Sequence, residues 1–439
     1  MAEISPESVP SDLYLTTDEV RAMFLDFFMR KGYAHHPNVG VIPENDPTLL
    51  FINSGMAPMK PFFTGEATPP TDQLTNVQDC IRTGDLDDVG DSYHGTSFHM
   101  MGSWQFGDRF NKEQAIEYAY ELITDGFGLD PDYLLASVLN DEAKEQGIPK
   151  DEEAAQAWAK LLPNERIIWL PPSDNLWGPP GTSGPSGPCT EVFFDRGSGF
   201  EEGYDNVALR KGRHIEIWNA GVFMTHHVAE DGTVTPLASK SVDGGAGLER
   251  IAMILQNAPS IHEIDKWLPA YDVIRTDNQD TRSARIVIDH IRTAEILARS
   301  GVIPGNKAGP YVLRTLLRRA MTTLVQTGIE QGRLLEYRDA ICEQMDEVPG
   351  TVRTHNEVST IFAKERDAFA KILQRSERLL APIVARGETT GNELYKLHET
   401  HGIPVDILRE TCNSNNIQFP EETFAAARSK HAEESSATK

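Results

Sequence analysis

The strongest constraint on the fold is a change of pattern near residue 258. Before it, apolar residues form short runs or alternate with polar ones, as in 49–52, 74–83 and 96–101, which predicts strands. After it, apolar residues recur at helical spacing, as in 286–299 and 358–386. Strands first and helices later predict an α+β domain followed by a helical region.

The length of 439 residues exceeds one ordinary core and predicts two or three domains. We place the α+β domain at residues 1–257. Pro349-Gly350 is a turn signal within the helical part. It divides that part into a middle region, 258–348, and a C-terminal region, 349–439.

Composition and sequence patterns indicate a soluble cytoplasmic protein. The chain is 39% hydrophobic and 24% charged, and no run of 18 apolar residues suggests a membrane span. The acidic segment 1–7 lacks the basic and apolar parts of a signal peptide. The four cysteines show no paired spacing, which favours free thiols and argues against a structural zinc site: Cys80, Cys189, Cys342 and Cys412.

The net charge of -25 limits how the chain could bind nucleic acid. A protein that grips phosphates needs a positive footprint, so any RNA contact must come from a local basic patch. Arg314, Arg318 and Arg319 form one basic stripe at helical spacing. The alternatives are that these arginines form ion pairs within their domain or a solvated helix face, and that the acidic excess serves solubility.

A glycine-rich segment carries the first chemical signal. Asp243-Gly244-Gly245-Ala246-Gly247-Leu248-Glu249-Arg250-Ile251 turns from a predicted strand into a helix. Glycines let such a turn approach a nucleotide closely, and an arginine after it can hold a terminal phosphate. The alternative is a tight helix-packing turn. The segment resembles motif 3 of class II aminoacyl-tRNA synthetases.

Other segments resemble one branch of that class, the alanyl-tRNA synthetases, in the family's order. They are Asn45-Asp46-Pro47-Thr48-Leu49-Leu50-Phe51, Cys80-Ile81-Arg82, Asp174-Asn175-Leu176-Trp177, Gly187-Pro188-Cys189-Thr190-Glu191, Glu216-Ile217-Trp218-Asn219, Asp289-His290-Ile291-Arg292, Tyr311-Val312-Leu313-Arg314 and Gly402-Ile403-Pro404-Val405-Asp406. The resemblance implies an antiparallel six-stranded class II sheet flanked by helices, then a helical region that recognises the acceptor stem. It covers the family's catalytic fragment and neither its editing nor its C-terminal domain.

The resemblance implies ATP-dependent activation of alanine, or another small amino acid, to an aminoacyl-adenylate, with Mg²⁺ as cofactor and tRNA as acceptor. The nucleophile is a carboxylate, so the protein needs no catalytic base and must align two anions. An alternative is a paralogue that delivers the activated amino acid to a metabolite or carrier without tRNA. The oligomeric state stays open between a monomer and a class II-type dimer.

The resemblance assigns the catalytic and ATP-binding roles. Arg82 would bridge the amino acid carboxylate and the α-phosphate, and Arg250 would bind the γ-phosphate. Phe98 would stack on adenine. The alternatives are a surface salt bridge for Arg82 and a buried strand position for Phe98.

The remaining roles concern the amino acid, the metal and the tRNA. Asp243 would receive the substrate ammonium beside Gly245, Trp177 and Asn219 would wall the side-chain pocket, and Glu191 would organise Mg²⁺. The tRNA acceptor stem would contact the following residues: Arg314, Arg318, Arg319 and Asp406.

Several positions depart from the family pattern. Asp79 stands where an arginine or lysine is common, and His99 replaces a usual glutamate. Ser103 and Gly244 are smaller than the usual residues. These departures predict a remodelled pocket, which leaves the substrate open between alanine and another small amino acid.

Overall fold

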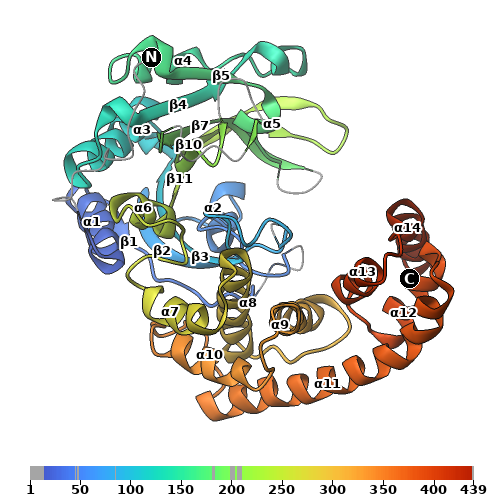
Figure 1. Cartoon of the computed structure of the whole chain (residues 1–439). Helices are drawn as coiled ribbons and strands as arrows, with labels where there is room; N and C mark the ends of the chain where they lie inside the picture. The colour runs from blue at the N-terminus through green and yellow to red at the C-terminus, as the bar shows by residue number, and fades with distance from the viewer. Residues whose placement is uncertain are drawn as a thin grey trace. The chain divides into compact units, whose positions relative to one another are not determined.

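The computed structural model describes residues 14–44, 46, 49–84, 86–179, 183–197, 203–204 and 210–437. The chain forms two compact units, drawn in Figure 1. Unit 1 comprises Met1–Asp272 with Gln344–Thr351, and unit 2 comprises Val273–Glu343 with Val352–Lys439. The predicted division into residues 1–257, 258–348 and 349–439 stays a prediction.

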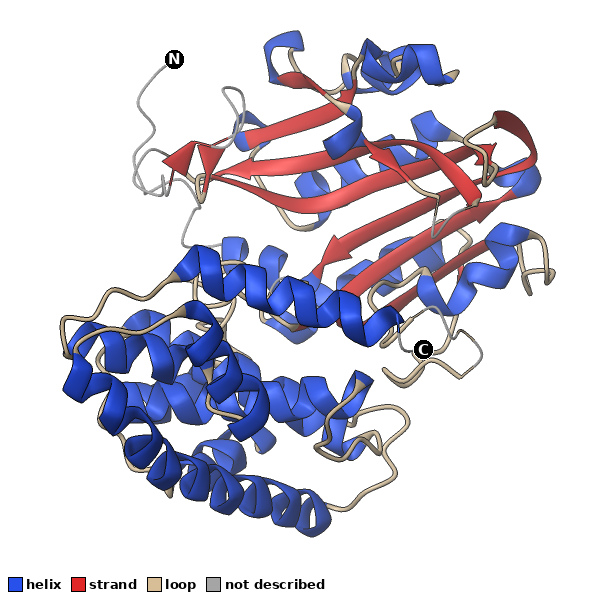
Figure 2. Ribbon diagram, turned by 90° about the vertical axis from the view of Figure 1, so that its right-hand side faces the viewer, coloured by secondary structure: helices blue, strands red, loops and turns tan. Residues whose placement is uncertain are grey.

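Unit 1 is built on a nine-stranded sheet, whose strands lie side by side in Figure 2. Its six central strands are antiparallel, in the order β2 (Gln73–Ile81), β3 (Ser97–Phe106), β11 (Val234–Gly247), β10 (His214–Val228), β7 (Gly184–Asp195) and β4 (Leu134–Leu139). The parallel edge strands β1 (Ala34–His35) and β5 (Ile167–Leu170) extend it, and β6 (Leu176–Trp177) pairs with β7. A separate two-stranded ribbon comprises β8 (Gly203–Tyr204) and β9 (Arg210–Lys211). The α+β class is confirmed.

Helices pack against this sheet. Helix α1 (Thr17–Arg30) begins at a capping box formed by Thr16 and Glu19. Its Phe24 ring lies 5.5 Å from the buried Trp218 ring of β10. The other α-helices that begin in unit 1 are α2 (Lys60–Thr64), α3 (Lys112–Glu121), α4 (Glu152–Trp158), α5 (Pro172–Asn175), α6 (Leu248–Leu255) and α7 (Leu268–Asp277).

The prediction of a strand at residues 49–52 is wrong. Phe51 and Ile52 are buried as expected, but they lie in a loop. The backbone N–H of Ile52 donates to the Val41 carbonyl, and its carbonyl accepts from Ile81. These isolated bonds satisfy the buried backbone without a ladder, so apolarity alone did not define a strand.

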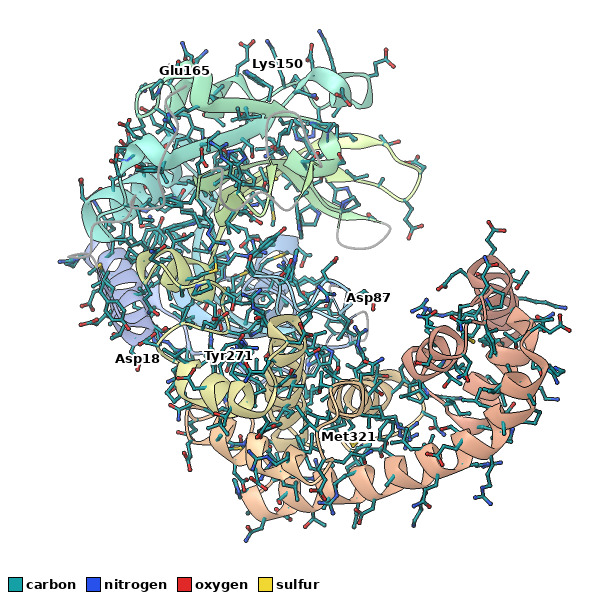
Figure 3. All side chains as sticks on the ribbon, in the orientation of Figure 1. Asp18, Asp87, Lys150, Glu165, Tyr271 and Met321 are labelled. Atoms are coloured by element: carbon teal, nitrogen blue, oxygen red, sulfur yellow. The ribbon has the colours of Figure 1, made fainter. Side chains whose placement is uncertain are left out.

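Unit 2 is helical, as predicted. Its helices are α8 (Thr281–Arg299), α9 (Ala308–Gln326), α10 (Arg333–Cys342), α11 (His355–Arg386), α12 (Gly391–His401), α13 (Val405–Ser414) and α14 (Glu421–Ala437). Met321 of α9, labelled in Figure 3, is fully buried. Helix α11 ends at Gly387, whose φ of 73° is the left-handed conformation that glycine adopts most easily. Among the described residues, no helix is long and apolar enough to cross a membrane.

Strand β10 contains a β-bulge between Asn219 and Val222. Asn219 pairs with Gly245 of β11 and Val222 pairs with Asp243, so β10 carries one extra residue between these pairs. In a regular strand, positions three apart point to opposite faces. The bulge therefore lets Asn219 and Val222 line the same cavity.

Candidate active site

Unit 1 contains a cavity of about 310 Å³ over the central strands. Its lining comes from β3, β7, β10, β11, the start of α6 and the loops around residues 54 and 93. All eight residues predicted for ATP and amino acid binding line it: Arg82, Phe98, Trp177, Glu191, Asn219, Asp243, Gly245 and Arg250. The fold thus brings together segments separated by up to 168 positions in the sequence.

Arg82 and Phe98 are neighbours in the lining of the cavity. Arg82 directly follows β2, and its guanidinium carbon lies 5.0 Å from the centre of the Phe98 ring of β3. Its Nε donates to the Asn53 carbonyl at 3.0 Å, which fixes the plane of the group. Phe98 is only partly buried, so the expectation of an entirely buried strand residue does not describe it. A cation and an aromatic face side by side suit a nucleotide.

Arg250 reaches the cavity from the first turn of α6. Its Nη1 donates to the Glu216 backbone carbonyl at 2.9 Å and contacts the Glu216 carboxylate at 3.2 Å. Its guanidinium also lies 5.5 Å from the centre of the Tyr93 ring. The family resemblance includes the segment of Glu216 but implies no role for this carboxylate. It is a second acidic group beside Glu191 in the lining.

Glu191 has an unfavourable setting for a carboxylate. Burial and the nearby carboxylates of Glu216 and Asp174 raise its pKa well above the usual range, although Arg250 opposes this shift. A divalent cation would relieve the repulsion, and carboxylate oxygens are the ligands that Mg²⁺ prefers. The donor set of Glu191 and Glu216 therefore fits this ion.

A second group of possible metal ligands lies in unit 2 and does not suit a cation. Glu295, Cys342 and His355 have ligand atoms within 4.8 Å of one another. However, Glu295 already accepts from Arg338 at 2.7 Å and from Arg299 at 2.8 Å. Two guanidinium groups beside the same carboxylate compensate its charge and would repel a metal ion.

Asp243 and Asn219 form the polar end of the cavity. The Trp104 indole N–H donates to Asp243 Oδ1 at 2.7 Å. Burial raises the pKa of Asp243 to about 6, although this hydrogen bond lowers it. Within the described part of the chain, Asn219 Oδ1 is buried without a hydrogen-bond partner. A carboxylate and an orphaned amide oxygen suit a ligand with several N–H donors, such as an ammonium group.

The walls beside this polar end leave little space. A Cβ atom on Gly245 would lie 3.1 Å from Met100 Sδ, so the glycine keeps the cavity open at this point. Trp177 and Val222 also line the cavity. The arrangement suits a small apolar side chain next to the ammonium site.

The two charge departures noted in the sequence form one ion-paired cluster. Asp79 and His99 are direct partners across β2 and β3, with His99 Nε2 3.0 Å from Asp79 Oδ1. His99 Nδ1 lies 2.8 Å from Glu249 Oε1 at the start of α6. Burial alone would lower the pKa of His99, but the carboxylates of Glu249 and Asp79 raise it to about 9. His99 therefore holds a positive charge between two carboxylates, next to Phe98 and Arg250.

The predicted basic stripe lies on α9 in unit 2, and two of its arginines meet one buried acid. Arg318 Nε donates to Glu365 at 2.8 Å, and Arg314 Nε lies 3.7 Å from the same carboxylate. Arg319 follows Arg318 on the helix. Arg314 and Arg318 thus form ion pairs within the helical region, and their contact with RNA stays a prediction.

The second predicted acceptor-stem element lies next to this stripe. Arg318 Nη1 is 3.3 Å from the position that a Cβ atom on Gly402 would take. Gly402 precedes α13, which contains Asp406. The side chain of Asp406 lies outside the described part of the chain.

Charge is distributed very unevenly between the units. Unit 1 contains 18 Lys and Arg residues against 45 Asp and Glu residues, a net charge of -27. Unit 2 contains 23 against 21, a net charge of +2. The acidic excess thus belongs entirely to unit 1.

Comparisons with known proteins agree with the geometry. The family described as "tRNA synthetases class II (A)" matches residues 19–439. Alanine–tRNA ligases of Rubrobacter xylanophilus and Natranaerobius thermophilus are 34% and 37% identical over 96% of this chain, covering 50% and 49% of their own lengths. That of Treponema denticola is 36% identical over 95% of this chain and 72% of its own length. The chain thus spans about half the length of the first two relatives.

Proposed function

The chain belongs to the class II tRNA synthetase family that includes the alanine–tRNA ligases, and from this premise we propose that it activates alanine with ATP and transfers it to tRNA. One observation carries the proposal. The guanidinium groups of Arg82 and Arg250 and the carboxylate of Asp243 line a single cavity of about 310 Å³. These are the charges needed for a triphosphate and an amino acid.

In the activation step, a carboxylate oxygen of the amino acid attacks the α-phosphorus of ATP, and pyrophosphate leaves. The attacking group is already ionised, so no residue has to remove a proton. Arg82 holds both the carboxylate and the α-phosphate through its planar fork, and Phe98 stacks on the adenine. Arg250 neutralises the γ-phosphate, and the charge that develops at phosphorus is stabilised by these fixed donors.

The polar end of the cavity selects a free α-amino acid. Asp243 pairs with the ammonium group, and Asn219 Oδ1, buried and unpaired among the described residues, accepts another of its hydrogens. Met100 and Val222 line the cavity beside this end. The neighbouring walls leave room for a methyl group and disfavour larger side chains.

We place Mg²⁺ at Glu191 and Glu216. When bound, this ion would offset the negative charge of the triphosphate and its leaving pyrophosphate. The two glutamates would orient it, and Arg250, which contacts Glu216 at 3.2 Å, would link the metal site to the γ-phosphate site.

The four free cysteines suit a reaction in the reducing cytoplasm.

The acceptor in this proposal is the tRNA acceptor stem, bound by unit 2. Support comes from the positive net charge of this unit and from the position of Arg318 beside Gly402. Phosphate contacts by arginines position a duplex even where they read no base. Arg314, Arg318, Arg319 and Asp406 are the residues that we assign to this contact.

Two assays with the whole chain test the proposal. ATP–pyrophosphate exchange is measured with each of the standard amino acids, and transfer of labelled alanine is measured with an acceptor-stem minihelix of tRNAAla. We expect exchange with alanine above all others, and charging of the minihelix. Absence of alanine-dependent exchange would refute the assignment. Exchange without charging would instead support delivery of the amino acid to another acceptor.

Replacing Arg319 with Glu is expected to weaken tRNA charging without changing alanine activation. Reversing one phosphate-contacting charge should raise the KM for the minihelix by roughly 10-fold and reduce its salt dependence. The matched control is Arg378→Glu, which makes the same charge change at an exposed position of α11. Equal losses in both variants would mean that α9 holds no specific contact.

A further inference from the structure

We propose that Trp104 is a positioning residue for amino acid recognition, because its indole N–H aims the Asp243 carboxylate at the α-ammonium group of the substrate. The inference rests on the proposed function. It adds a residue that does not itself line the cavity and that no sequence signal indicated. Its evidence is the cross-strand geometry of β3 and β11.

Trp104 and Asp243 face each other directly across the sheet. They are register partners in the antiparallel pairing of β3 with β11, and their side chains meet at 2.7 Å between Nε1 and Oδ1. Trp104 is fully buried. An indole can only donate, so this contact fixes one carboxylate oxygen as the acceptor and leaves the other acceptor positions for the ligand.

Two glycines leave room for the indole ring. A Cβ atom on Gly102 would lie 2.1 Å from Trp104 Cη2, and a Cβ atom on Gly55 would lie 3.0 Å from Cζ2. The ring therefore occupies space that only glycines at these positions leave open. The ring is fully buried and packs in one apolar cluster with its neighbours, which restricts the direction of its N–H.

Trp104 also supports the cavity from below. It packs in one apolar cluster with Met56 and Val222, and both of these residues line the cavity. The indole thus packs behind side chains that line the cavity and does not line it itself. Through this packing it couples the position of Asp243 to the shape of the cavity next to it.

The hydrogen bond also affects the charge that the ammonium group needs. Burial raises the pKa of Asp243 to about 6, and the Trp104 N–H is the contact that lowers it. Without this donor, a smaller share of Asp243 would be ionised near neutral pH. The other charged or titratable groups in the same lining are Arg82, His94, Glu191, Glu216, Glu249 and Arg250.

The test is Trp104→Phe, which keeps an aromatic ring and removes the donor. KM for alanine and kcat are measured by pyrophosphate exchange at about pH 6 and about pH 8.5, on either side of the expected titration. We expect KM for alanine to rise about 10-fold at the lower pH, where loss of the donor lowers both the ionised share of Asp243 and its fixed orientation. At the higher pH the increase should be smaller but should persist, because only the orientation is lost there. KM for ATP should not change, because Arg82 and Phe98 are untouched.

The control is Trp169→Phe at an exposed position of β5. It should leave both constants unchanged at both pH values. If Trp104→Phe does not fold, Gly55→Ala provides the second variant: it keeps the N–H but presses on the ring, and it should raise KM for alanine while KM for ATP stays constant. An unchanged KM for alanine at the lower pH, in a wild-type protein that activates alanine, would overturn the inference. A wild-type protein without any exchange would instead refute the proposed function.

Discussion

Replacing Asp243 with Asn is expected to abolish alanine activation while making the fold more stable. The amide cannot pair with the substrate ammonium, and loss of one partner of a buried ionic contact should lower kcat/KM on the order of 1,000-fold. Its Oδ1 can still accept from the Trp104 indole, so the packing of the site is retained. Loss of activity would then not reflect loss of structure.

The gain in stability follows from the pKa of Asp243, which burial raises from 3.8 to about 6. A carboxyl group whose pKa is raised in the folded state makes the fold less stable as the pH rises from about 4 through 6. At neutral pH the cost reaches about 3 kcal/mol, and a neutral amide avoids it. The increase in the free energy of unfolding should therefore be largest above pH 6 and vanish near pH 4.

Urea denaturation of both proteins at these pH values measures the effect, with pyrophosphate exchange as the activity assay. The control is Asp231→Asn in the exposed hairpin, where hydrogen bonds from Thr233 lower the pKa of the carboxylate. It should neither stabilise the protein nor change activity. An Asp243→Asn protein that retains activation would contradict the ammonium assignment.

The second large effect is expected from reversing the charges around His99. His99→Glu would place three carboxylates together, those of Asp79, Glu249 and the new side chain, and should destabilise the fold by about 3–5 kcal/mol. Asp79→Arg would set two cations side by side. The double variant, Asp79→Arg with His99→Glu, restores opposite charges across the same strand pair and should recover most of the loss.

The wild-type protein should also show the pH dependence of this cluster. The folded pKa of His99 is about 9, above its ordinary value of 6.5, so its contribution is complete below pH 6.5 and is lost as the pH rises through 9. The loss should amount to about 3 kcal/mol. The charged groups around it are Asp79 and Glu249 in contact, and Asp346, whose pKa the charge of His99 helps to lower. Arg21 in turn acts on Asp79.

His99→Gln should remove this dependence, and its stability should be flat over the same range. Denaturation of the four proteins of the cycle at neutral pH gives the coupling between positions 79 and 99. Additive losses in the double variant would show that the two side chains do not act as a pair.

The sequence was sufficient to predict the fold class and the composition of the site. The helical spacing after residue 258 depends on local contacts, and the prediction drawn from it is confirmed. The eight cavity residues were found through family motifs, although their separate roles stay predictions.

Other features depend on pairing between distant strands, which no local pattern encodes. Asp79 and His99 looked like two unrelated departures until the register of β2 and β3 joined them. No sequence pattern singles out Trp104, because its link to Asp243 crosses 139 positions. The bulge in β10 could not be predicted from the sequence either, because an extra residue is defined only by the register with the partner strand.

The uneven charge of the two units has a kinetic consequence for any polyanionic partner. An approaching polyanion meets long-range repulsion from the acidic unit and almost no net field from the helical one, so encounter is favoured at unit 2. Added salt shortens the reach of that repulsion to about 8 Å at physiological strength. Moderate salt should then speed association even though it weakens the arginine contacts that hold the complex, the reverse of the rate behaviour of a uniformly basic binder.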